Sequence, residues 1–410
     1  MLLSMSGKTT LKRSLSLPMM VLYGLGTTIG AGIYALVGEI AKVAGYYAPV
    51  SFLIASLLAG FTAISFAELC ARFPYAAGAA LYVKQAFASN RLSTLVGLFV
   101  IAAGVVSAAA LANGFIGYLH QFINIDRHMA IILVIALLGI IAAWGIAESV
   151  AIAALITVLE IGGLLLVIAV SGEGLLSLPE RWPELIPPAK ITAWGAIYLG
   201  SLLSFYAFIG FEDMVDVAEE VKDVKRNLPA AILLTLGITT ILYIVLMTTA
   251  VLSLPPAVLA ASKTPLVQLY EFHTGEKAIL ISVIGMFAII NGALIQMIMA
   301  SRVIYGMGSR GQLPALLATV HQRTQTPVFA TALVTSIVLV LALIGRLASL
   351  AEITSTIMLT IFSLVNLALW RIKHKDPRPE GVKTFPLWIP VVGFFVSFAF
   401  VLKKLIGLLI

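Results

Sequence analysis

Three carboxylates stand in two stretches of the chain that are otherwise apolar. Glu160 lies within Thr157–Gly163, and Glu212 and Asp213 follow Gly210 in a run of aromatic and aliphatic residues. A carboxylate surrounded by hydrocarbon is unfavourable, so its presence indicates either a functional role or an ion-pairing partner. Because burial disfavours the charged form, such a group can take up and release a proton near neutral pH. Glu160 is therefore a candidate for proton coupling, with a fixed structural carboxylate as the alternative interpretation. Glu212 has a structural interpretation too, because a carboxylate can stabilise the free N–H groups where a helix begins.

Glycines interrupt apolar stretches of the same kind at two places. Gly30 and Gly32 stand two residues apart near the middle of one stretch, and Gly210 interrupts another. Two glycines at this spacing cannot share a helix face, so tight helix packing explains only part of the pattern. Unwound backbone survives in a membrane only beside protein or a polar cavity. The glycines predict two broken helices with a binding cavity between them; a continuous packing helix is the alternative for the first.

The free backbone groups at such breaks would suit a zwitterion. One half-helix presents N–H groups with partial positive charge, and the other presents carbonyls with partial negative charge. We expect an α-carboxylate to lie against the amides of Ala31 and Gly32. An α-ammonium would meet the carbonyls near Thr28, Tyr206 and Ile209.

The elements that carry these residues follow from composition. Of 410 residues, 60% are hydrophobic and 11% are charged, and the mean hydropathy is +1.06. These values exclude a water-soluble fold, and each stretch of about 20 apolar residues can cross a bilayer as a helix. The sequence predicts a single all-α membrane domain of about eleven such helices. They cover residues 17–43, 48–70, 94–120, 129–147, 149–171, 193–217, 229–252, 278–307, 328–345, 351–370 and 386–402.

The glycine interruptions fall in the first and the sixth of these helices, which are corresponding positions in two sets of five. Interrupted helices at corresponding positions point to a site between inverted repeats. Because each set has an odd number of helices, the second set must be inverted in the membrane relative to the first. We expect repeat one over about residues 17–171, repeat two over about 193–370, and an extra helix over about 386–402.

The distribution of charge predicts the orientation. The net charge is +7, but the basic residues are spread among loops, which argues against a nucleic-acid partner. With the N-terminus in the cytoplasm, most of the 26 Lys and Arg residues fall on the cytoplasmic side, as the positive-inside rule requires. Lys403 and Lys404 fall on the opposite side. We therefore expect a multi-pass protein of the cell membrane, surrounded by the lipid bilayer.

Sequence signatures of enzymes are missing from the chain. It contains no His-Glu-x-x-His and no Gly-x-Ser-x-Gly, and the 5 histidines lie outside the predicted spans or at their ends. Cys70 is the single cysteine, so it forms no intramolecular disulfide, and it fits no metal-ligand spacing. We expect neither an enzyme nor a cofactor nor a metal site.

The motifs around these residues resemble those of one family of membrane proteins. Gly30–Ile33 is similar to the break in the first helix of the amino acid–polyamine–organocation (APC) superfamily of permeases. Phe205–Glu212 is similar to the sixth helix of that family, and Arg226–Pro229 to the loop after it. Phe66–Pro74 resembles the end of its second helix. The resemblance covers nearly the whole chain.

This resemblance implies a five-plus-five inverted-repeat fold and a secondary active transporter that works by alternating access. Its substrates would be amino acids or their decarboxylated amines, and a receptor or a channel of the same fold is the alternative. Tyr206 matches an aromatic that gates the outer side of the site, and the chain has eleven predicted helices where most relatives have twelve. The implied substrate-binding residues are Thr28, Ile29, Gly30, Ala31, Gly32, Tyr206, Ala207, Phe208, Ile209 and Gly210.

The resemblance also bears on coupling and on the substrate. Glu160 aligns with a lysine of proton-linked relatives, and Glu212 aligns with an acid found in several proton-linked exchangers. We therefore expect coupling to protons or exchange, without sodium. Beyond these two residues, Asp213 and Asp216, no span holds an obvious partner for a cationic side chain, so we expect a neutral amino acid. Glu68 and Gly292 are expected to have packing roles. The polar residues without an assigned role are Ser107, Asn113, Asn291, Thr354 and Ser355.

Overall fold

The computed structural model describes residues 13–75, 78–144 and 150–409, which form helices joined by short connections. Long helices stand at the positions predicted for the membrane spans, which confirms the predicted all-α membrane fold. They are α1 (Leu17–Ala44), α2 (Ala48–Arg72), α4 (Asn90–Leu119), α5 (Arg127–Trp144), α6 (Val150–Val170), α9 (Ile191–Tyr206), α10 (Val224–Ser253), α13 (Ile279–Ser309), α14 (Val328–Ile344), α15 (Leu347–Lys375) and α16 (Trp388–Leu409).

Short helices connect the long ones, and local sequence signals set several boundaries. Ser89 precedes α4, and its side chain accepts a hydrogen bond from the Leu92 amide at 3.2 Å. Gly45 follows α1 with a φ of +58°, a conformation that favours glycine and stops the helix. The short elements are η1 (Gly45–Tyr47), α3 (Gly78–Phe87), α7 (Glu173–Leu176), α8 (Leu178–Leu185), η2 (Phe211–Glu220), α11 (Pro256–Ala261), α12 (Pro265–Thr274) and η3 (Ala315–Ala318).

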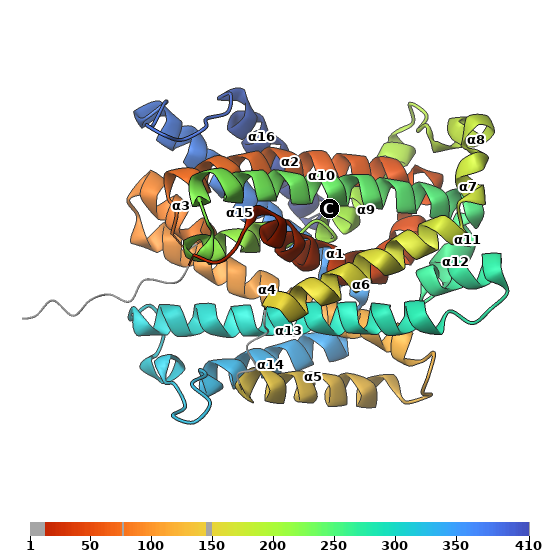
Figure 1. Ribbon diagram of the computed structural model, residues 1–410, viewed down its shortest axis with the longest axis horizontal. Helices are drawn as coiled ribbons and strands as arrows, with labels where there is room; N and C mark the ends of the chain where they lie inside the picture. Colours follow the sequence, from red (N-terminus) through yellow and green to blue (C-terminus); the bar gives the residue numbers. More distant parts are fainter. Residues whose placement is uncertain (1–12, 76–77, 145–149, 410) are drawn as a thin grey trace, which may run out of the picture.

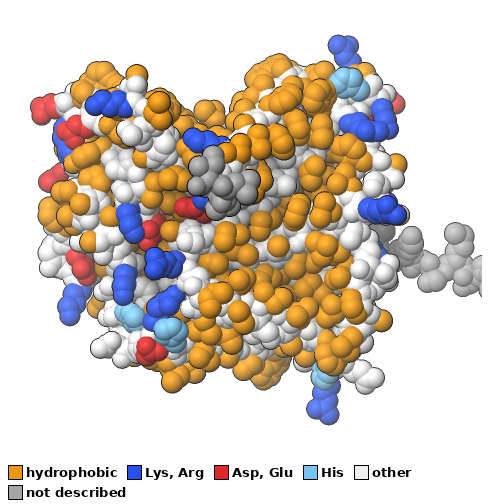
Figure 2. Space-filling view, turned by 180° about the vertical axis from the view of Figure 1, so that it is seen from behind, with side chains coloured by type: hydrophobic (Ala, Val, Ile, Leu, Met, Phe, Trp, Pro, Cys, Tyr) orange, Lys and Arg blue, Asp and Glu red, His pale blue; other side chains and the backbone are white. Residues whose placement is uncertain are grey.

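The outer surface of the bundle is apolar, as a bilayer requires. Within the described residues, 8 helical stretches are long and apolar enough to cross a membrane, and shorter apolar helical stretches cover 17–30, 154–170 and 328–344. On α5, Leu133, Leu137 and Ile140 share one face and are 54%, 52% and 59% exposed. Hydrophobic side chains cover most of the middle of the molecule in Figure 2, with charged side chains gathered mainly toward the left and right edges. The molecule is a multi-pass membrane protein.

The helices with glycine-rich stretches lie inside the bundle. In Figure 1 the long helices run roughly horizontally, with α1 and α9 between α2 and α10 above and α13, α14 and α5 below. Thr28, Ile29 and Ile33 of α1 are at most 2% exposed, and α1 contacts α6, α9, α10 and α13. The middle of α1 is thus buried among its neighbours, and its sequence from Val21 to Val37 contains no charged residue, as such a position requires.

The two lysines that the predicted orientation places on the non-cytoplasmic side contact neighbouring helices. Lys404 of α16 forms an ion pair with Glu352 of α15. The Nζ of Lys403 lies 3.9 Å from the ring centroid of Tyr198 in α9, a cation–π geometry. Both side chains therefore fix α16 to the bundle.

Candidate functional site

The sixth predicted membrane helix, called helix six below, corresponds to α9 and η2 and is broken where the sequence predicts it. α9 ends at Tyr206, the chain turns through Ala207–Gly210, and η2 continues from Phe211 as a 3₁₀-helix. Gly210 has a φ of +127°, and a Cβ on it would lie 2.6 Å from the carbonyl carbon of Thr27 in α1. Only glycine allows both this backbone conformation and this close approach.

Polar side chains fasten the break to neighbouring helices. The Thr27 hydroxyl donates to the Gly210 carbonyl and to the Gly24 carbonyl, each at 3.0 Å. The Tyr243 hydroxyl of α10 donates to the carbonyls of Thr28 at 3.0 Å and Ala207 at 3.1 Å. Backbone groups freed by the break thus find partners inside the bundle, which unwound backbone in a membrane needs.

Helix one is not broken, which corrects the prediction made from Gly30 and Gly32. α1 runs without interruption from Leu17 to Ala44. A Cβ on Gly32 would lie 2.7 Å from the Cα of Ala207, so this glycine lets the break in helix six approach α1 closely. A helix tolerates glycine at about 1 kcal/mol, which packing can offset. The expectation that the Ala31 and Gly32 amides are free helix-end donors is therefore wrong for this conformation.

A small pocket lies where α1, α4, the helix-six break and α13 meet. Its cavity volume is about 40 Å³, enough for a few water-sized groups. Four of the predicted substrate-binding residues line it: Thr28, Gly32, Tyr206 and Ile209. The other lining residues are Gly26, Thr27, Ser107, Leu111, Asp213, Gly292, Ile295 and Gln296.

Several predicted site residues lie behind this lining. Ile29, Gly30, Ala207, Phe208 and Gly210 are buried and do not line the pocket. The Phe208 ring packs edge-on against Phe52 and Tyr243, with centroid distances of 6.2 and 5.3 Å. Ala31 belongs to α1, but its side chain falls outside the described part of the structure. These residues shape the pocket through packing.

Tyr206 crosses the pocket from α9 to α4. Its hydroxyl lies 2.8 Å from the Ser107 hydroxyl and donates to the Ser107 carbonyl at 3.2 Å. This side chain links the helix-six break to α4, so its hydrogen bonds to Ser107 must break before those two elements can separate. The arrangement is compatible with the gate expected at Tyr206.

The pocket contains polar groups that are free to bind a ligand. Thr28 is 2% exposed, and its hydroxyl has no hydrogen-bond partner among the described residues. The Asp213 carboxylate lines the pocket, and no ion pair with it occurs in the described ranges. A buried hydroxyl without a partner is unfavourable unless a ligand or water satisfies it.

The structure adds residues that sequence reasoning did not assign to the site. Ser107 had no role, Gly292 was expected only to pack, and Asp213 was noted only as a carboxylate. Gln296 was missed, although an amide within the apolar stretch of α13 was itself a signal. Three of the other four unassigned polar residues make structural bonds: Asn113 to the Ala342 carbonyl, Thr354 to the Leu350 carbonyl and Ser355 to the Leu202 carbonyl.

Glu160 lies beside the site and not in its lining. It is 2% exposed in α6, and its carbonyl accepts a hydrogen bond from the Tyr34 hydroxyl of α1 at 2.7 Å. A Cβ on Gly30 would lie 3.4 Å from Oε2 of Glu160 and 3.7 Å from the Ala288 carbonyl of α13. The carboxylate thus occupies the junction of α6, α1 and α13, where a change in its charge would act on helix packing.

Glu212 caps the start of η2. Its Oε2 accepts a hydrogen bond from the Gly210 amide at 2.9 Å. This is one of the two roles that the sequence left open for Glu212, because a carboxylate stabilises the free N–H groups where a helix begins.

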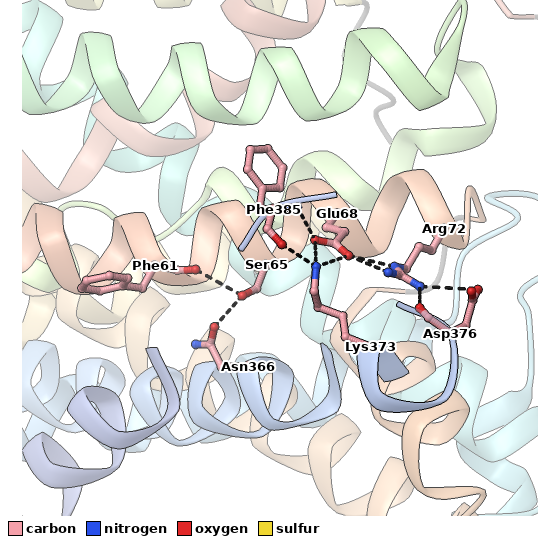
Figure 3. A network of polar contacts seen from close by, with 8 residues as sticks. All are labelled: Phe61, Ser65, Glu68, Arg72, Asn366, Lys373, Asp376 and Phe385. Atoms are coloured by element: carbon pink, nitrogen blue, oxygen red, sulfur yellow. Dashed lines mark hydrogen bonds and ion pairs between the residues drawn. The ribbon is translucent and has the colours of Figure 1, made fainter. Parts of the chain in front are cut away.

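Glu68 lies outside the pocket, in a buried network of charges that joins α2 to α15 (Figure 3). Its carboxylate accepts hydrogen bonds from the Lys373 Nζ at 2.7 and 2.8 Å and from the Phe385 amide at 2.9 Å. It also accepts two from the Arg72 guanidinium, at 2.7 and 3.0 Å. The contacts agree with the packing role expected for Glu68.

Comparison with known proteins identifies the family. Residues 15–406 match the family model described as amino acid permease. The chain belongs to this family. Because the match covers most of the sequence, the relationship includes every helix that contributes to the pocket.

Several proteins whose names describe them as transporters or permeases are similar to this chain. The vacuolar cationic amino acid transporter 2 of Arabidopsis thaliana is 29% identical over 393 residues, 90% of this chain and 61% of that protein. The branched-chain amino acid permease BcaP of Bacillus subtilis is 26% identical over 443 residues, 99% of this chain and 93% of that protein. The methylthioribose transporter of the same bacterium is 26% identical, covering 94% and 87%. The chain thus spans less than two thirds of the plant relative's length.

Proposed function

We propose that the protein is a secondary carrier that moves an amino acid across a membrane by alternating access. The observation that carries this proposal is a polar pocket enclosed in an apolar helix bundle, at the point where helix six is broken against α1. Sites of this kind lie at broken helices near the midplane of transporters. Relatives whose names state amino acid transport support the same class of substrate.

The pocket suggests how a zwitterion would bind. The Asp213 carboxylate would accept the α-ammonium group in place of the helix-end carbonyls. The α-carboxylate would take hydrogen bonds from hydroxyl and amide donors in the lining, those of Thr28, Ser107 and Gln296. Because the α-ammonium would use the single carboxylate among the described lining residues, no second acid would be left for a cationic side chain. The substrate is therefore proposed to be a neutral amino acid.

Transport requires the pocket to open to each side in turn. The cavity of about 40 Å³ is smaller than the 300–1,000 Å³ of typical ligand sites, so binding must be accompanied by separation of its walls. The Tyr206–Ser107 contact is the proposed outer gate. Movement of one five-helix repeat against the other, over the ranges 17–171 and 193–370, would produce the alternation.

We further propose that Glu160 couples transport to protons and that the protein has a defined orientation in the membrane. Glu160 would carry the coupled proton at the junction of α6 and α1, and transport would be independent of sodium. The N-terminus would face the cytoplasm, and the cell membrane is the proposed location.

A ligand screen with matched variants tests the proposal. A ligand that binds the folded state raises the midpoint of thermal unfolding, so the purified protein is screened against the common amino acids and polyamines. Asp213→Asn should abolish the shift given by the best ligand, while Asp216→Asn, an exposed carboxylate outside the lining, should leave it unchanged. Equal ligand-induced shifts of the unfolding midpoint in the two variants would show that Asp213 is not part of the site.

Flux measurements separate the carrier from its alternatives. Reconstituted protein should show saturable uptake and counterflow of the ligand found in the screen. Binding without flux would identify a receptor, and flux that does not saturate and shows no counterflow would identify a channel.

A further inference from the structure

A second pocket lies far from the substrate site, at the end of the bundle that the sequence predicts to be cytoplasmic. It is formed where α3 ends, α4 begins and α13 ends, at the left of Figure 1. Its cavity volume is about 570 Å³, within the range of ligand-binding sites. The lining residues are Lys84, Asn90, Arg91, Thr94, Arg310 and Gln312.

The charge of this pocket is positive and uncompensated. Lys84, Arg91 and Arg310 contribute three cations, whereas the described lining contains no carboxylate. In the described ranges, none of the three forms an ion pair. Three like charges around one cavity repel each other, so an anion would be bound favourably. Asn90, Thr94 and Gln312 add neutral hydrogen-bonding groups, and guanidinium groups can bind phosphate oxygens in a bidentate manner.

Exposed apolar residues extend from the pocket along one face of α4. Leu95 and Leu98 follow Arg91 by four and seven residues, so all three side chains share one face of the helix. Both leucines are 42% exposed. They occupy the first turns of a membrane-crossing helix, where the surrounding medium changes from headgroups to hydrocarbon. A free phosphate compound would use only the charged part of this surface, whereas a phospholipid would use both parts.

We propose that this pocket binds the headgroup of an anionic phospholipid. The lipid phosphate would lie among Arg91, Arg310 and Lys84, and an acyl chain would follow Leu95 and Leu98. Basic pockets between helices at the cytoplasmic surface are suited to such headgroups, because the inner leaflet supplies them at high local concentration. Since α4 and α13 also line the substrate pocket, a bound lipid would bridge two walls of that site.

Binding is tested on the full chain, purified in a nonionic detergent. Short-chain phosphatidylglycerol, short-chain phosphatidylcholine and glycerol phosphate are titrated separately, and the midpoint of thermal unfolding is followed. We expect saturable stabilisation by phosphatidylglycerol alone. Arg91→Gln combined with Arg310→Gln should weaken the apparent affinity about 25-fold, at about fivefold for each cation. The matched control is Arg323→Gln combined with Lys375→Gln, exposed cations at the same end of the bundle but outside the pocket.

The outcomes are distinct. An equal loss in the pocket and control variants would mean that surface charge alone attracts the lipid, and the site would be rejected. Equal saturation by glycerol phosphate would identify a soluble phosphate compound as the ligand and reject the lipid. If the double variant fails to fold, Gln312→Glu places a carboxylate in the lining with little change in shape, and it should weaken phosphatidylglycerol binding. Unchanged binding by that variant would also reject the site. These measurements do not use transport and are independent of the proposed function.

Discussion

Replacing Lys373 by methionine should destabilise the protein by about 3 kcal/mol. The Lys373 Nζ donates to both oxygens of Glu68, at 2.8 and 2.7 Å, and to the Phe385 carbonyl at 2.6 Å (Figure 3). The side chains of Lys373 and Glu68 are 6% and 0% exposed, so water cannot replace the lost donor. Removing one partner from a buried ion pair destabilises by about 3–5 kcal/mol. Arg72 still faces Glu68 after the substitution, which favours the lower end of this range.

The assay is unfolding in mixed micelles, followed by tryptophan fluorescence. Lys375→Met is the matched control, because Lys375 lies two residues further along α15 and is exposed. Glu68→Gln should destabilise more than Lys373→Met, since it leaves the buried Lys373 without a carboxylate and Arg72 with only the exposed Asp376 as an acidic partner. The reasoning is refuted if Lys373→Met unfolds within about 0.5 kcal/mol of Lys375→Met, the size of an ordinary surface substitution. A larger destabilisation by Lys373→Met than by Glu68→Gln would refute it as well.

Three further predictions concern the site. Gly32→Val should abolish ligand binding, because a Cβ at this position would meet the Cα of Ala207 at 2.7 Å; unchanged affinity in the ligand screen would contradict this. Glu160→Gln should retain counterflow but lose uptake driven by a pH gradient, since it mimics the protonated acid; survival of both activities in the same liposomes would make Glu160 structural. Uptake into proteoliposomes should be equal in sodium and choline buffers, and a steep dependence on sodium would overturn the assignment of proton coupling.

The positions of the membrane helices and the break in helix six could be predicted from the sequence. Both depend only on the residues of one segment. A bilayer requires about 20 apolar residues for each crossing, and charged groups inside a crossing are unfavourable, so they indicate a special local structure. Gly210 followed by Glu212 and Asp213 identified the break because these residue types are unfavourable in a continuous membrane helix. The family resemblance supplied the same segments, and the family match over residues 15–406 agrees with it.

Only the tertiary structure decided what the glycines of helix one do. Gly30 and Gly32 are compatible either with a break or with close packing. The choice depends on Glu160 and Ala207, which lie more than a hundred residues away in sequence and approach α1 only in the folded bundle.

The same reason explains why the pocket lining was only partly predicted. Thr28 and Tyr206 belong to segments marked by their own sequence, whereas Ser107 and Gln296 are single polar residues on α4 and α13 whose direction depends on helix rotation. The pairing of Glu68 with Lys373, 305 residues apart, was likewise beyond sequence reasoning. Local sequence determined which segments cross the membrane and which one breaks, because hydrocarbon acts on each segment separately. Contacts between distant helices determined which side chains meet, because rotation and packing belong to the whole bundle.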